Sequence, residues 1–143
     1  RTHMAYTDQK FYTRQFVNVK PTTSWGTATA SGAGGHDLTN VVELPKFIRR
    51  SAITAVRLKV TTIPNAASTA LLATLLNGTS VIGTAVLTTA ALGATVDFVI
   101  TTAANGTLAA DTEPTINLTG TATASAAAAG AYDTFIEFNE LFS

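Results

Sequence analysis

A long stretch without any charged residue, positions 60–96, limits most strongly what this chain can fold into. Two apolar runs within it, 71–76 and 81–87, are separated by a segment that begins with Asn77 and Gly78. An Asn-Gly pair between apolar runs predicts a β-hairpin, because a type I′ turn needs positive φ at both central residues. We therefore expect the central hairpin of a β-sandwich here.

Short runs with alternating apolar and polar residues occupy much of the remaining sequence. Within 53–63, Val56, Leu58 and Val60 fall on one face and polar or charged residues on the other, as in a half-buried strand. The last run of this kind is 132–138. About eight such runs, at a spacing of roughly 8–14 residues and without a long helix, predict an all-β sandwich or barrel. One of these strands is expected over 95–102.

The expected domain organisation is simple. A chain of 143 residues fits one domain, which buries about two-thirds of its unfolded surface. Residues 1–3 resemble a tag remnant, and 4–20 are expected to form an N-terminal arm or first strand. Residues 21–40 are expected to form a flexible loop rich in Gly and Thr, and 41–143 the β-sandwich domain.

The composition narrows the classes of partner. The net charge is zero, which argues against a general nucleic-acid binder because such a protein carries a basic stripe. There is no cysteine, so a disulfide framework or a thiolate metal site is excluded. Only 13% of residues are charged, whereas 27 are Thr and 25 are Ala. Such a surface suits a chain that partner subunits cover in part. Residues 71–92 are long enough to cross a membrane, but their glycines, threonines and asparagine argue against it, so we expect no membrane partner.

Residues that could carry catalysis are few. His36 is the only histidine outside the remnant, and no Gly-x-Ser-x-Gly nucleophile elbow accompanies it. Asp111 and Glu113 share a loop and could hold Ca²⁺ with loop carbonyls, or they are simply solvated. Asp133 and Glu137 are expected to pair with basic residues of neighbouring strands. We expect no enzyme, no metal and no cofactor, with a carboxylate-based hydrolase as the remaining enzymatic hypothesis.

Two features are candidates for binding a partner. Trp25, the only tryptophan, lies in the 21–40 stretch, where it either folds back to cap the sandwich edge or anchors a partner. Lys46, Arg49 and Arg50 form the one local basic cluster, interleaved with apolar residues. A docking patch for an acidic protein surface fits this cluster better than a nucleic-acid site, and an ordinary solvated turn is the remaining interpretation.

The segment 51–143 resembles the head decoration or auxiliary capsid proteins of tailed bacteriophages. The resemblance is carried by the strand Ala-Val-Arg-Leu-Lys-Val at 55–60 and by the Thr/Ala-rich middle with Leu-Asn-Gly-Thr at 76–79. An aromatic and acidic C-terminal strand at 132–138, followed by Leu-Phe at 141–142, completes it.

This resemblance implies a single antiparallel, jelly-roll-like β-sandwich and a non-enzymatic virion structural protein. Such a protein would be made in the host cytoplasm and would decorate and stabilise the assembled phage head, as a homo-oligomer, with a trimer favoured, bound to the major capsid protein. Its N-terminal arm would dock through Phe11, Tyr12, Arg14 and Phe16. The alternative is a receptor- or carbohydrate-binding head or fibre module, with Trp25 and its loop as the contact.

Overall fold

The computed structural model describes residues 11–27, 29–30, 36–66, 68–87, 92–123 and 127–141, with the backbone alone at 11–13, 15, 16, 22, 29, 30, 36 and 38. This part of the chain contains eleven strands: β1 (Phe11–Ser24), β2 (Thr29–Ala30), β3 (His36–Glu43), β4 (Ser51–Thr62), β5 (Ser68–Asn77), β6 (Ser80–Val86), β7 (Thr95–Asp97), β8 (Val99–Ile100), β9 (Thr107–Leu108), β10 (Thr115–Ala122) and β11 (Ala131–Leu141). A short 3₁₀ helix, η2 (Ala103–Gly106), precedes β9. No helix among the described residues is long and apolar enough to cross a membrane.

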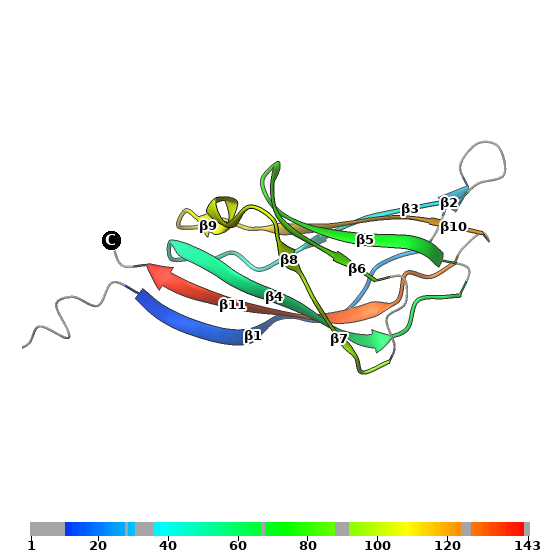
Figure 1. Ribbon diagram of the computed structural model, residues 1–143, viewed down its shortest axis with the longest axis horizontal. Coiled ribbons are helices and arrows are strands. Elements are labelled where there is room, and N and C mark those ends of the chain that lie inside the picture. The colour runs from blue at the N-terminus through cyan, green and yellow to red at the C-terminus, as the bar shows by residue number, and fades with distance from the viewer. Residues whose placement is uncertain are drawn as a thin grey trace, which may run out of the picture.

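The strands pair as a nested set of antiparallel partners. β1 pairs with β11, β3 with β10, β4 with β7, and β5 with β6, so the chain resembles one long hairpin. Wrapping this hairpin brings β11 beside β4 and β10 beside β5. Two sheets result, β1-β11-β4-β7 and β2-β3-β10-β5-β6-β8, and Figure 1 shows them as two layers. This order confirms the predicted antiparallel, jelly-roll-like sandwich.

The strand expected over 95–102 is divided between the two sheets. β7 pairs with β4 in one sheet, and β8 pairs with β6 in the other. Between them lies Phe98, which is buried and whose N–H donates to the Val56 carbonyl at 2.9 Å. Figure 1 shows this segment passing from one layer to the other. It therefore closes one side of the sandwich.

The predicted hairpin is present, but its turn is shifted by one residue. Asn77 pairs with Ser80, so the two central residues are Gly78 and Thr79. Gly78 has a φ of +62°, whereas Thr79 is not among the residues with positive φ. The prediction of a type I′ turn with Asn77 and Gly78 at its centre is therefore wrong. The Asn77 amide instead donates to the Asn105 carbonyl at 3.1 Å, which holds this residue at the end of β5 and joins the hairpin to η2.

The core lies between the two sheets, and the predicted inward faces are confirmed. Val56, Leu58 and Val60 of β4 are at most 1% exposed. Tyr132 and Ile136 of β11 are completely buried, as are Leu71, Leu75, Ile82, Ile116 and Leu118 of the opposite sheet. These side chains supply the apolar burial that stabilises the fold.

The stretch 21–40 is not one loop. β1 continues to Ser24 and β3 begins at His36, so both ends of this stretch belong to strands. Pro21 lies inside β1, where a missing N–H is tolerated because β1 pairs only with β11 and is an edge strand. Residues 28 and 31–35 lie outside the described residues. Residues 11–20 therefore belong to the first strand of the sandwich, which is one of the two interpretations given for 4–20.

Candidate protein-docking site

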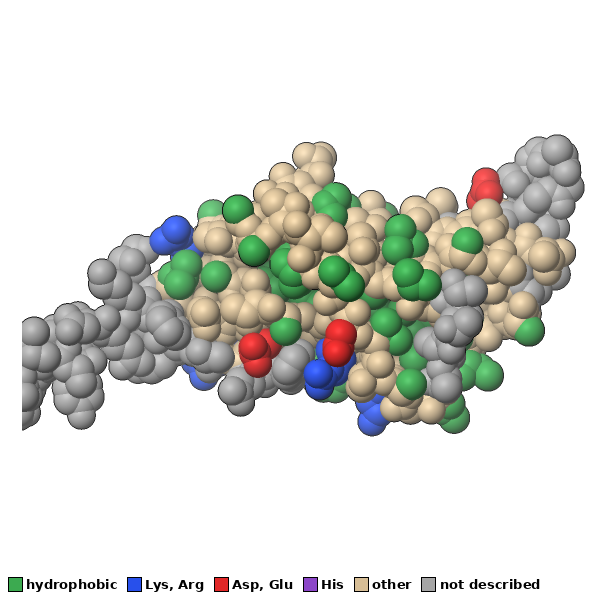
Figure 2. All heavy atoms as spheres, in the orientation of Figure 1, with side chains coloured by type: hydrophobic (Ala, Val, Ile, Leu, Met, Phe, Trp, Pro, Cys, Tyr) green, Lys and Arg blue, Asp and Glu red, His purple; other side chains and the backbone are tan. Residues whose placement is uncertain are grey.

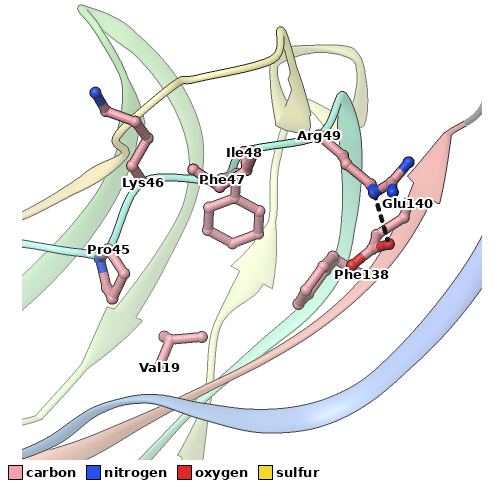
Figure 3. Close-up of a pocket in the computed structure, with 8 residues that line it drawn as sticks. All are labelled: Val19, Pro45, Lys46, Phe47, Ile48, Arg49, Phe138 and Glu140. Atoms are coloured by element: carbon pink, nitrogen blue, oxygen red, sulfur yellow. Dashed lines mark ion pairs between the residues drawn. The ribbon is translucent and has the colours of Figure 1, made fainter.

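The sandwich is open on the side opposite β7 and β8. Two hollows lie there, between β1 and the chain from β3 to the start of β4. The first has a volume of about 290 Å³ and is lined by Val19, Pro45, Lys46, Phe47, Ile48, Arg49, Phe138 and Glu140 (Figure 3). We call it the Phe47 hollow. The second, of about 300 Å³, is lined by Lys20, Thr23, Ser24, Asn40, Val41, Val42 and Glu43. Both are bounded by β1 and by the chain from β3 to the start of β4, and Phe138 and Glu140 of β11 also line the first.

The Phe47 hollow has an apolar, aromatic floor. The rings of Phe47 and Phe138 meet edge to face, with centroids 4.8 Å apart and an interplanar angle of 68°. Figure 3 shows both rings and Val19 facing the same space, whereas the Lys46 side chain points away from it. Ile48 is 67% exposed at the rim. An apolar side chain of a partner would replace water over this floor.

Backbone hydrogen bonds hold the segment that carries Phe47. The Leu44 N–H donates to the Pro114 carbonyl at 3.1 Å, and the Phe47 N–H donates to the Thr112 carbonyl at 2.7 Å. The 44–48 segment is thus fastened to the loop before β10. Hydrogen bonds within the chain therefore order this wall of the hollow, so a partner need not order it on binding.

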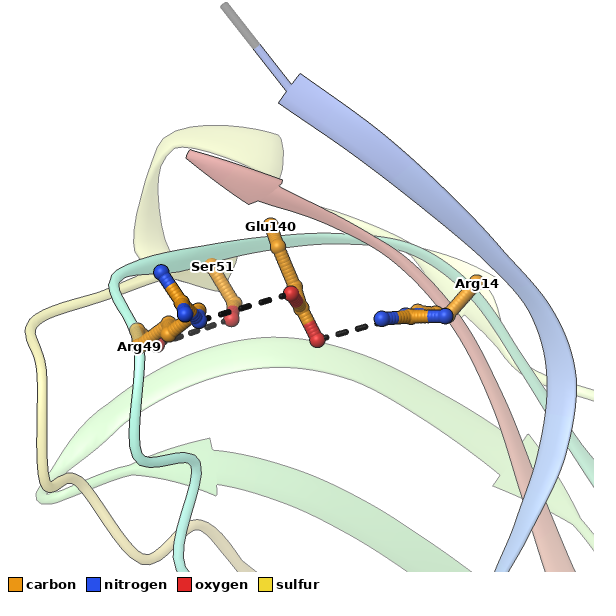
Figure 4. A network of polar contacts seen from close by, with 4 residues as sticks. All are labelled: Arg14, Arg49, Ser51 and Glu140. Carbon is orange, nitrogen blue, oxygen red and sulfur yellow. Dashed lines mark hydrogen bonds and ion pairs between the residues drawn. The ribbon is translucent and has the colours of Figure 1, made fainter. Parts of the chain in front are cut away.

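The charged rim is organised by Glu140. Its Oε1 lies 3.3 Å from Arg14 Nε and its Oε2 lies 3.8 Å from Arg49 Nε (Figure 4). The Glu140 side chain is only 18% exposed, whereas those of Arg14 and Arg49 are 53% and 63% exposed. The Ser51 hydroxyl also donates to the Arg49 carbonyl at 2.9 Å. One carboxylate thus holds two accessible guanidinium groups, which are suited to hydrogen-bond a partner's carboxylates.

The structure brings several predicted residues together. Arg14 and Arg49, which are far apart in sequence, meet at Glu140, and Lys46 lies at the same hollow. Arg50 is exposed, and its carbonyl accepts the Leu141 N–H at 2.8 Å. Phe11, Tyr12 and Phe16 lie on β1 by their backbones, but their side chains are outside the described residues. Their role as anchors stays a prediction.

Trp25 requires a correction. Its side chain is completely buried, and it packs edge to face against Tyr132 in the core. The indole therefore caps the sandwich, which is one of the two interpretations that the sequence left open. It is not available as a surface anchor, because a partner could reach it only by displacing the core.

The basic cluster at 46–50 is also less isolated than the sequence suggests. It lies beside the loop before β10, where Phe47 forms a β-bridge with Thr112 and the Asp111 N–H donates to the Ile48 carbonyl at 3.3 Å. The side chains of Asp111 and Glu113 on this loop are exposed. This surface is therefore of mixed charge, which favours a specific protein contact over a general polyanion.

Six residues of the Phe47 hollow are not among the candidates predicted from the sequence: Val19, Pro45, Phe47, Ile48, Phe138 and Glu140. A signal for Glu140 exists, because it continues the inward alternation of Tyr132, Thr134, Ile136 and Phe138. A charged residue on an inward face needs a partner or lies at an opening of the core. The structure shows that both apply here.

Two of the other described carboxylates have polar partners of their own. Arg57 donates to Asp97 at 2.8 Å, and Glu137 accepts a hydrogen bond from the Thr54 hydroxyl at 3.1 Å. The register places Asp133 opposite Lys59, and its expected pairing with a basic residue of a neighbouring strand stays a prediction. Within the described part of the chain, no group of three or more His, Cys, Asp or Glu residues is placed to hold a metal ion.

Fold and site define the class of this chain as a jelly-roll-like β-sandwich with an apolar, charge-rimmed hollow on its open side. No protein-family model, no curated protein and no solved structure matches the chain.

Proposed function

We propose that this chain is a non-enzymatic structural protein of a virion, which decorates and stabilises an assembled phage head by binding the major capsid protein. The observation that carries the proposal is the Phe47 hollow, where an aromatic floor lies next to two exposed guanidinium groups held by one carboxylate. Such a site suits a peptide segment with an apolar side chain beside an acidic one.

The low charge and the Thr/Ala-rich composition support the same proposal. A surface with few charges suits a protein that is displayed in many copies and is partly covered by its neighbours. Many modest contacts on one shell then give a long-lived attachment, since each bound copy keeps the local concentration of the others high. A homo-oligomer bound to the shell is part of this proposal.

The alternative, a carbohydrate- or receptor-binding module, is less well supported. It relied on Trp25 as the contact, and this side chain is buried. No aromatic side chain is among the exposed large hydrophobic residues of the described chain. A stacking platform for a sugar ring is therefore not found on this part of the surface.

Co-sedimentation with shells assembled from the major capsid protein encoded in the same genome tests the proposal. Ile48→Asp places a carboxylate at the rim of the hollow, and Ile63→Asp is the matched control because Ile63 is 53% exposed outside it. We expect Ile48→Asp to weaken binding at least tenfold and Ile63→Asp to bind like the wild type. Failure of the wild type to bind shells would overturn the virion role, and equal binding by both variants would overturn the site.

A further inference from the structure

The two sheets differ in how they carry charge. In the sheet β2-β3-β10-β5-β6-β8, Asp37 and Glu43 lie on β3, whereas β5, β6, β8 and β10 contain no Asp, Glu, Lys or Arg. The opposite sheet carries at least one charge on each long strand, including Arg14 on β1, Lys59 on β4 and Asp133 on β11. The uncharged stretch of the sequence thus becomes one uncharged region of the folded surface.

The register places apolar side chains together on the outer face of this sheet. Leu76 is opposite Val81, and Leu72 is opposite Val86. Thr84 lies between these two pairs along β6, and it is opposite Val99. Val86 and Val99 are each 67% exposed and Val81 is 37% exposed. We call these six residues the neutral face: Leu72, Leu76, Val81, Thr84, Val86 and Val99. Figure 2 shows hydrophobic side chains grouped over β6 and β8.

The sheet edges are less suited to association than this face. β1 is a long edge strand, but it carries Arg14, Lys20 and Pro21 and has three register shifts against β11. Charges, proline and bulges on an edge strand all oppose pairing with another chain. The other outermost strands, β2, β7 and β8, have only two or three residues each. The exposed apolar residues on the outer face of β5, β6 and β8 are therefore better placed for association than the strand edges.

We propose that the neutral face binds the neutral face of a second copy of this chain, related by a two-fold axis. A charged partner surface placed here would lose its hydration without gaining any charged group in return. A second copy presents the same uncharged grid of Val, Leu and Thr, and a two-fold axis makes such a surface complementary to itself. Packing through the opposite sheet would instead bury residues such as Arg57 and Lys59.

The size of the face sets the strength of this contact. The three strands of the face, about 4.8 Å apart and over roughly six residues of about 3.3 Å each, cover about 300 Å² per copy. A standard interface buries about 800 Å² per partner. The pair is therefore weak in dilute solution and forms where copies are crowded, as on an ordered surface. This contact does not depend on the proposed virion role.

Sedimentation equilibrium from micromolar to millimolar concentration tests the pairing. We expect the average mass of the wild type to rise from 14.8 kDa toward twice this value. Val86→Lys should raise the dissociation constant at least tenfold, because it buries an uncompensated charge in the contact. Ile63→Lys, at an exposed position outside the face, should leave it unchanged. Circular dichroism checks that both variants are folded.

A cysteine variant gives a second, independent readout, because the chain has no cysteine. Thr84→Cys places a thiol near the centre of the face, and oxidation should join two copies at millimolar concentration. Ile63→Cys should remain largely monomeric under the same conditions. A wild type that stays at 14.8 kDa, a mass that converges on three copies, or equal cross-linking of both cysteine variants would overturn the two-fold pairing.

Discussion

The indole of Trp25 meets the phenol ring of Tyr132 edge to face, with ring centroids 4.9 Å apart and an interplanar angle of 62°. Both side chains are completely buried. The backbone N–H of Trp25 donates to the Gly130 carbonyl at 3.0 Å, and the Tyr132 hydroxyl donates to the Ala129 carbonyl at 2.8 Å. This pair therefore fastens the end of β1 to the segment that leads into β11.

Trp25→Ala should lower the free energy of unfolding by about 3–5 kcal/mol, because it leaves a large cavity in the core. Trp25→Phe should cost clearly less, since it keeps an aromatic ring and removes an indole N–H that has no hydrogen-bond partner. Urea denaturation of the three proteins measures the difference. A loss below about 1 kcal/mol for Trp25→Ala would show that the indole is not a core residue in solution.

Alkaline pH should destabilise the fold through Tyr132. Burial raises the pKa of Tyr132 from 10.0 to about 12, because the buried site disfavours the phenolate. The neutral phenol is thus favoured in the folded state, so this contribution is complete below pH 10 and is lost as the pH rises toward 12. A shift of this size corresponds to about 2–3 kcal/mol.

Comparison with Tyr132→Phe isolates this effect from the titration of lysines. The variant loses the hydrogen bond to Ala129 at every pH, so its stability is lower near neutrality. Its further loss of stability between pH 10 and 12 should be smaller than that of the wild type. Parallel pH curves for the two proteins would contradict the raised pKa.

Much of the fold follows from local patterns in the sequence. The alternation around Val56, Leu58 and Val60 predicts an inward face, because each sheet of a sandwich meets the core with only one of its two faces. The same alternation runs through 95–100, yet this segment changes sheets at Phe98. Which strand it pairs with depends on β4 and β6, and no property of its own residues specifies this.

The candidate site was less predictable than the fold. Arg14 is predicted as a docking residue of the N-terminal arm and Arg49 as part of a local basic cluster. Their meeting at Glu140 depends on the pairing of β1 with β11, which are the first and last strands. Trp25 lies in a stretch whose composition is typical of a loop. It is buried because its backbone pairs with residues near 130, a contact over more than one hundred positions of the sequence.

Thr134→Val should stabilise the protein. Thr134 is completely buried on β11, and its hydroxyl has no hydrogen-bond partner. Replacing the hydroxyl by a methyl group removes an unsatisfied polar group, for an expected gain of about 1–2 kcal/mol in the free energy of unfolding. Thr107→Val is the control, because Thr107 is exposed and the change should stay within about 0.5 kcal/mol. Thermal and urea unfolding both measure the gain.

Gly130→Ala should be more costly than Gly78→Ala. Both glycines have positive φ, +93° and +62°, so both substitutions carry a backbone cost of about 1–2 kcal/mol. At Gly130 the new Cβ would also lie 2.6 Å from the Thr62 carbonyl oxygen, whereas at Gly78 nothing lies within 4 Å. Equal losses of stability for the two variants would show that the backbone around residue 130 adjusts freely.

Glu140→Gln separates the stability of the fold from the organisation of the docking site. The two ion pairs of Glu140 join it to guanidinium groups that are more than half exposed, so each contributes at most about 1 kcal/mol to stability. We expect the variant to unfold at nearly the wild-type urea concentration, with a difference that shrinks further in high salt. Shell binding should weaken several-fold, because Arg14 and Arg49 are no longer held by one carboxylate. Thr54→Ala is the matched control and should bind normally. It removes the hydroxyl that donates to Glu137, which lies on β11 as Glu140 does. A large loss of stability in Glu140→Gln would mean instead that Glu140 serves mainly to hold β1 on β11.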